Sequence, residues 1–211
     1  MLESALVHQR DRSQVNARMY QLLVSVMCLL TIAAAQASSI RQLHLDDVSQ
    51  QSELIFVGEV VNSVASWNPQ RSRITTQITF RIDEVIKGSY SEANLQLGFA
   101  GGTVGDATME YEGLRYPIIG ESGIYFVETI AKPLVNPLVG WSQGHFLLDA
   151  QERVNTYDGK PVSTVQRKIP TTSQGTNQIS RGIAQGLQLA SQPQNAMSRA
   201  EFVQHIKQSI E

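Results

Sequence analysis

The sequence predicts a mainly β protein, with an antiparallel barrel or sandwich, a short helix before it and an amphipathic helix at the C-terminal end. Residues 74–82 alternate between apolar and polar side chains, the period of two that is typical of a half-buried strand. Short turns separate further apolar runs along the chain, which favours antiparallel neighbours over an α/β arrangement. Residues 198–210 combine a helix start signal with one apolar stripe.

The N-terminal segment, residues 1–37, is typical of a secretory signal peptide. Three arginines precede an apolar run over residues 20–35, and the small-x-small cleavage signal Ala-Gln-Ala follows. The run is shorter than the about 20 residues of a membrane-spanning helix, and no basic cluster follows it. We therefore expect cleavage between Ala37 and Ser38, export to the periplasm or the medium, and no stable membrane span afterwards. Met19 is an alternative start, although a chain beginning there would lack all three arginines.

Cysteine content and charge exclude several classes of function. The single cysteine, Cys28, lies inside the apolar run, so cleavage would leave a mature chain without thiols. Thiol catalysis, zinc–thiolate sites, redox roles and disulfides are then excluded, and the core alone must supply stability. The net charge is −2 and the basic residues are scattered, which predicts that nucleic acid is not a partner.

Composition divides the mature chain into three parts. Residues 38–166 carry the strand patterns and form the predicted β-barrel domain. Residues 167–196 are rich in Ser, Thr, Gln, Asn and Gly, which predicts a polar linker with one weak helix near residues 179–190. Residues 197–211 form the predicted C-terminal amphipathic helix.

The first half of the domain is predicted as a short helix followed by three strands. The helix falls within residues 40–53, with Asp46 and Asp47 in its first turn. A strand over residues 54–66 contains Gly58, which indicates a bulge or a close backbone approach. After a turn at residues 68–70, strands are expected over 74–87 and 94–99.

Glycine and proline residues separate the predicted strands in the second half of the domain. The glycine-rich residues 100–106 lack the Gly-Lys-Ser/Thr of a phosphate loop and no helix pattern follows, so we expect a mobile connection with positive φ angles. Residues 109–116 alternate weakly and end at Pro117, whereas residues 124–130 predict a strong strand. Short strands are expected over residues 138–141, 145–149 and 154–157, with a tight turn at Asp158 and Gly159.

The C-terminal helix has the clearest local signal. Ser198 and Glu201 match a capping box, and Met197 and Phe202 are spaced as a hydrophobic staple. The apolar stripe consists of Phe202, Val203, Ile206 and Ile210.

No catalytic, cofactor-binding or metal-binding residue is predicted. His44, His145 and His205 are far apart in sequence and form no pair spaced for one metal ion, so we expect single solvated or hydrogen-bonded imidazoles. The segment around Ser122 is one residue short of a Gly-x-Ser-x-Gly elbow and precedes a strand instead of a helix.

Acidic residues gather near the glycine-rich loop. They are Asp106, Glu110, Glu112 and Glu121. Glu110 and Glu112 would point to the same side of a strand, where like charges repel without a cation or solvent between them. A solvated face is the preferred interpretation, and calcium binding is the alternative. Aromatic residues offer a similar choice between a groove and the core, with the core preferred: Trp67, Tyr111, Tyr116, Tyr125 and Trp141.

Two segments carry a resemblance to known proteins. Residues 54–60, with an apolar-Gly-x-Val pattern, and residues 80–88, ending in Lys-Gly, resemble a group of uncharacterised exported bacterial proteins. In that group Gly120-Glu121 and residues 140–146 recur in similar order. More distantly, the chain resembles netrin-module and tissue-inhibitor-of-metalloproteinases domains. The resemblance spans residues 54–149 and implies an OB-like five-stranded barrel with attached helices. Those inhibitors chelate the protease zinc through an N-terminal cysteine, which the mature chain lacks, so that mechanism is not carried over.

These observations predict an exported, non-enzymatic binding domain without a cofactor, whose partner is an extracytoplasmic protein or another ligand. Two alternatives remain. One is a hydrolase or carbohydrate-active protein that uses the carboxylates of residues 106–121. The other is a protease-inhibitor-like module that works without the N-terminal cysteine.

Overall fold

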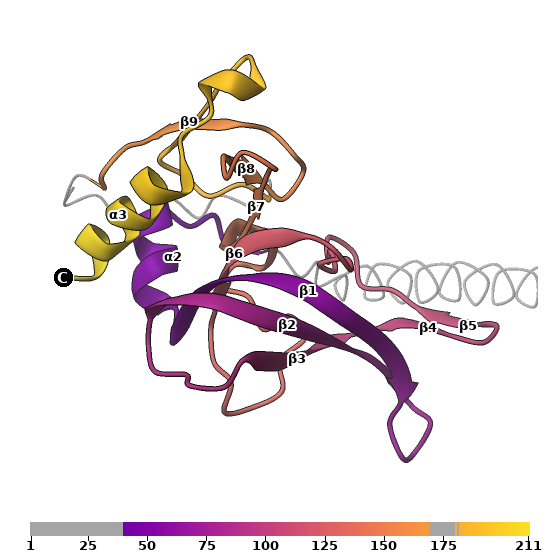
Figure 1. The fold of residues 1–211 in the computed structure, drawn as a ribbon. Helices are drawn as coiled ribbons and strands as arrows, with labels where there is room; N and C mark the ends of the chain where they lie inside the picture. Colours follow the sequence, from indigo (N-terminus) through magenta and orange to yellow (C-terminus); the bar gives the residue numbers. More distant parts are fainter. Residues whose placement is uncertain (1–39, 169–179, 181) are drawn as a thin grey trace, which may run out of the picture. The chain divides into compact units, whose positions relative to one another are not determined.

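A six-stranded antiparallel sheet forms the centre of the chain (Figure 1). The computed structural model describes residues 40–168, 180 and 182–211, so the predicted signal peptide lies outside the described residues. The strand order is β3-β2-β1-β6-β7-β8. The strands are β1 (Leu54–Trp67), β2 (Ile74–Lys87), β3 (Asn94–Ala100), β6 (Ser122–Val127), β7 (His145–Leu148) and β8 (Val154–Thr156). The prediction of a mainly β, antiparallel fold is confirmed.

Helices and two small sheets complete the described chain. Both predicted helices are present, as α2 (Leu45–Gln51) and α3 (Arg199–Ile210). Two 3-10 turns are η2 (Trp141–Gly144) and η3 (Pro193–Asn195). One small sheet pairs β4 (Gly102–Val104) with β5 (Ala107–Met109), and the other pairs β9 (Val162–Val165) with β10 (Leu187–Leu189). Within the described ranges, no helix has the length and apolar content to cross a membrane.

The long strand β1 is shared between two neighbours and bends to reach both. Residues 54–59 pair with β6 on one side, while β2 follows β1 over its whole length with three shifts of register. One shift lies between Val57 and Gly58, where the sequence predicted a bulge or close approach. A Cβ at position 58 would lie 2.3 Å from the carbonyl oxygen of Arg81, so only glycine fits between the strands.

The predicted barrel is not closed in the described part of the chain. β3 and β8 stand at the two ends of the strand order and do not pair with each other. At the end of β3, a backbone hydrogen bond from the Ala100 N–H to the Val135 carbonyl joins this strand to the loop after β6. The sheet therefore curves without completing a cylinder.

Two apolar cores lie on opposite faces of the sheet. The first is built on an aromatic group in which Tyr125 stacks on Phe56 and meets Phe80 edge-on. The second joins the sheet to both helices, with Phe146 of β7 contacting Phe202 of α3, and Leu45 of α2 packed in the same cluster. Because α2 and α3 share this second core, the C-terminal helix is part of the folded unit.

The predicted polar linker contains ordered structure. Residues 169–179 and 181 lie outside the described residues, but β10 and η3 fall within the predicted linker range of 167–196. Leu187–Leu189 is a strand, so the predicted weak helix is wrong at this end. The reason is tertiary: β10 pairs with β9, and buried Ala184 joins the second core.

The glycine-rich loop is also more regular than predicted. Gly101, Gly102 and Gly105 have positive φ angles as expected, but β4 and β5 form a hairpin around the last of them. The weakly alternating residues after Met109 form no strand. Residues 138–141 likewise give one isolated bridge at Leu138 and the turn η2, because Gly140 and Trp141 both adopt left-handed conformations.

The capping box at the start of α3 is confirmed. The Ser198 hydroxyl accepts a hydrogen bond from the Glu201 N–H, and the Glu201 carboxylate accepts one from the Ser198 N–H at 2.8 Å. Replacing Ser198 by alanine should lower the free energy of unfolding by about 1 kcal/mol, because one N–H at the helix start loses its acceptor. Urea denaturation of residues 38–211 measures this. Ser66→Ala, at an exposed position in β1, is the control and should leave the midpoint unchanged.

Candidate functional site

A groove of about 390 Å³ runs beside the free edge of β3. We call it the β3-edge groove. One wall is formed by residues of β2 and β3 together with Arg73, which precedes β2, and the other by the loop of residues 129–137 that follows β6. Its lining residues are Arg73, Ile74, Thr75, Gln77, Gln96, Leu97, Gly98, Ala100, Tyr111, Thr129, Ile130, Lys132, Pro133, Leu134, Val135 and Pro137. The groove occupies the opening between β3 and the loop that follows β6, where the sheet does not close.

The lining of the β3-edge groove mixes apolar and uncharged polar residues with two positive charges and contains no carboxylate. Ile130 and Val135 are 43% and 44% exposed, so the groove presents aliphatic surface to solvent. Arg73 and Lys132 are exposed, and neither forms an ion pair with any described residue. The groove thus offers contact surface and unpaired positive charge together.

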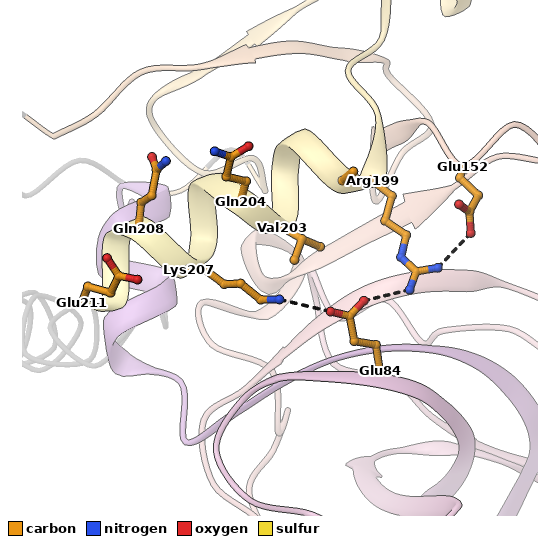
Figure 2. A pocket seen from close by; sticks show the side chains of 9 residues that line it. Glu84, Glu152, Arg199, Val203, Gln204, Lys207, Gln208 and Glu211 are labelled. Carbon is orange, nitrogen blue, oxygen red and sulfur yellow. Dashed lines mark hydrogen bonds and ion pairs between the residues drawn. The ribbon is translucent and has the colours of Figure 1, made fainter.

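A second groove, of about 840 Å³, lies along α3 (Figure 2). Glu84 accepts hydrogen bonds from Arg199 at 2.9 Å and from Lys207 at 3.3 Å, and Arg199 also donates to Glu152 at 2.8 Å. The bond from Arg199 is the main reason that the pKa of Glu84 lies below its usual value. Gln204 points away from this network in Figure 2. These charges are already paired with one another. We therefore interpret the network as a structural one that holds α3 against β2 and the turn before β8.

A buried histidine lies beside an ion pair, next to the first core. His145 is 1% exposed, stacks on the Tyr125 ring at 5.1 Å, and has no hydrogen-bond partner for Nε2 among the described residues. Glu121 Oε2 lies 3.9 Å from that nitrogen, but Glu121 is bound to Arg115 at 2.7 Å and to the Ile118 N–H at 2.7 Å. Burial and, to a smaller extent, the positive charge of Arg115 lower the pKa of His145 to about 3, so the imidazole is neutral.

The other two histidines of the described residues, His44 and His205, lie beside one carboxylate, that of Asp46. His205 Nε2 lies 3.1 Å from Asp46 Oδ1, and His44 Nδ1 accepts a hydrogen bond from the Asp46 N–H. Burial raises the pKa of Asp46, but hydrogen bonds from the Lys168 N–H and from His205 outweigh it, and the net pKa is lowered. This cluster could not be predicted from spacing in the sequence, because 159 positions separate Asp46 from His205. It joins α2, α3 and the end of the segment after β9.

The four predicted acidic residues do not converge on one site. Asp106 lies in the β4–β5 turn, Glu110 and Glu112 are exposed in the loop after β5, and Glu121 is paired with Arg115. The expectation that Glu110 and Glu112 share a strand face is wrong, because β5 ends at Met109. Across residues 40–168, 180 and 182–211, no three His, Cys, Asp or Glu side chains are placed to hold a metal ion.

The aromatic residues divide between core and surface. Tyr125 is fully buried, as the preferred interpretation predicted, and Tyr116 packs against Phe99 at the edge of the same core. Tyr111 lines the β3-edge groove, and Trp67 and Trp141 are half-buried. A groove lined by all five therefore does not form.

Comparison with known proteins gives no relative: no protein-family model, curated protein or solved structure matches the chain.

Proposed function

We propose that this chain is an exported, non-enzymatic binding domain that takes its ligand in the β3-edge groove. The observation that supports this most is the composition of that groove. It combines exposed aliphatic side chains with two unpaired cations and contains no carboxylate or histidine. Such a lining suits recognition, because the side chains that most often transfer protons in catalysis are missing from it.

The finer architecture that goes with this proposal is an OB-like, incompletely closed barrel. Supporting it, β1, β2 and β3 form a meander, and β1 also pairs with β6 through its first residues. Register shifts in β1 supply the bending that such a barrel needs. In this arrangement the β3-edge groove is the place where closure is incomplete.

The hydrolase alternative gains no support from the described geometry. Its four carboxylates do not share one site, and the one that is half-buried, Glu121, forms an ion pair with Arg115. The histidine nearest to Glu121, His145, is buried beneath Tyr125. A pair of acids with separate roles requires two carboxyl groups in different environments that face one substrate. Glu110 and Glu112 line one pocket, but both side chains are exposed to solvent in the same loop.

Site-specific crosslinking tests the proposal. A photoreactive phenylalanine derivative placed at Gln96, in the β3-edge groove, should form adducts in an envelope extract. The same group at Asn62, on an exposed part of β1, is the matched control and should not form them. Excess unmodified protein should compete the adducts away.

Two results would contradict the proposal. One is an identical set of adducts from both positions. The other is turnover of an ester, peptide or glycoside by purified residues 38–211, with a rate that one substitution abolishes.

A further inference from the structure

We propose that the β3-edge groove binds an extended acidic peptide segment, which adds to β3 as an additional antiparallel or parallel strand. This inference rests on the proposed function and names the class of ligand for that same groove. Three features of the described residues carry it: the free backbone groups of β3, the charge of the groove and the shape of its walls.

The backbone groups of β3 alternate between its neighbour β2 and the open edge. The Gly101 N–H donates to Ile74 of β2, and the Ala93 carbonyl accepts from Ile82 of β2, so the odd-numbered residues of β3 face β2. The even-numbered residues face the edge, as the bond from the Ala100 N–H to Val135 shows. No register shift interrupts the pairing of β2 with β3.

Two residues on that edge therefore have backbone groups available for pairing. The N–H and C=O of Gln96 and Gly98 point outward, and no described residue bonds to them. Such groups are a template for another strand, and peptide recognition by strand addition uses them. Gly98 has no side chain, and the side chain of Gln96 projects from a face of the sheet and not from its edge, so neither blocks an approaching backbone.

The charge of the groove selects an acidic ligand. Arg73 stands at the β2 side and Lys132 in the opposite loop, and the lining contains no Asp or Glu to neutralise them. A negatively charged side chain in the groove would gain two favourable interactions, whereas a positive one would meet repulsion from both walls. The whole chain has a net charge of −2, so this positive groove is a local feature.

The loop wall favours a strand with alternating side chains. Successive side chains of an added strand point to opposite faces, so acidic residues on one face leave aliphatic residues on the other. Ile130 and Val135 of the loop offer exposed aliphatic surface for such residues. Their exposure would fall when a strand occupies the groove.

A peptide-binding measurement tests the inference. The probe is a fluorescein-labelled hexapeptide of alternating glutamate and valine, and its binding to residues 38–211 is followed by fluorescence anisotropy. The control peptides carry lysine in place of glutamate, or N-methyl groups on every second residue in either register. We expect the acidic peptide to bind, the lysine peptide not to bind, and N-methylation in one register to weaken binding at least tenfold.

Variants of the protein separate the two recognition features. Gln96→Pro removes one outward N–H, which an edge strand tolerates, while Gln96→Ala keeps it. Arg73→Glu combined with Lys132→Glu reverses the groove charge, and Arg41→Glu reverses an exposed charge outside the groove lining. Binding should fall at least tenfold for the proline and double variants and stay unchanged for the two controls, with unchanged urea midpoints throughout.

Other outcomes overturn the inference in distinguishable ways. The inference that an acidic peptide adds to β3 as a strand is overturned if the acidic and lysine peptides bind equally well. It is also overturned if Gln96→Pro and Gln96→Ala bind the acidic peptide equally well. Groove-specific crosslinks at position 96 without any peptide binding would overturn it while leaving the binding domain in place. A dimer in sedimentation that Gln96→Pro dissociates would mean that a second copy of the chain occupies the edge instead.

Discussion

Replacing Phe80 by alanine is expected to lower the free energy of unfolding by about 3 to 5 kcal/mol, which would remove a large part of the stability of a domain of this size. Phe80 is completely buried and lies at the centre of the first core. Its ring meets Tyr125 at 4.7 Å and Phe56 at 5.5 Å, both edge-on. Truncation would remove these contacts and leave a cavity between β1, β2 and β6, which rigid strands cannot refill.

Urea denaturation of residues 38–211 measures the Phe80→Ala effect, and Val64→Ala is the matched control. Val64 is also an apolar residue of the same strand pair, but it is 52% exposed and belongs to neither core. Its truncation should change stability by less than about 0.5 kcal/mol. A similar loss for both variants would mean that the aromatic group does not hold the sheet together, and the described core would be wrong.

Local signals account for most of what the sequence predicted. The alternation over residues 74–82 identified β2 because one face of that strand is buried and the other is not. Gly58 identified a close approach because a side chain there would strike the neighbouring strand. The Ser198 and Glu201 pair identified the start of α3, since both partners lie within one helical turn. In each case the pattern lies within a few residues, even where, as at Gly58, its cause is on a neighbouring strand.

Features that depend on distant partners were not predictable in this way. Leu187–Leu189 is a strand because β9 lies beside it, while its own composition is that of a polar segment. The pairing of β1 with β6 and the open edge of β3 are properties of topology, which alternation within one strand does not reveal. The resemblance to OB-like domains implied a barrel, but the described strands leave it open.

The β3-edge groove could not be predicted from the sequence for the same reason. Gln96 and Gly98 are ordinary strand residues, and Arg73 and Lys132 are ordinary surface cations when considered singly. What makes a site of them is the unpaired edge of β3 and the loop of residues 129–137 opposite to it. A weak signal did exist in the sequence: the cluster of proline and exposed aliphatic residues over 130–137 is longer than a tight turn requires.

His145 should make the folded protein lose stability as the pH falls, and replacing it by phenylalanine should remove this loss. Burial sets the folded pKa of His145 at about 3, while an unfolded histidine titrates near about 6.5. Between these values the unfolded chain binds a proton that the folded chain does not, so protonation favours unfolding and stability rises with pH. The expected slope is about 1.4 kcal/mol per pH unit, or about 2 kcal/mol between pH 6.5 and 5.

His145→Phe isolates this contribution because the ring keeps its stacking position on Tyr125 while losing the unpartnered nitrogen. At pH 7.5 the variant should be as stable as the wild type or more so, since no hydrogen bond of Nε2 is lost. Below pH 6.5 its advantage should grow steadily, and the difference between the two unfolding free energies cancels the carboxylates and other histidines common to both. Parallel stability curves from pH 7.5 to pH 5 would show that His145 titrates alike in both states. Its Nε2 would then be reached by solvent or held by the Glu121 carboxylate, 3.9 Å away, and the sheet would be more open at β7 than the burial of this side chain implies.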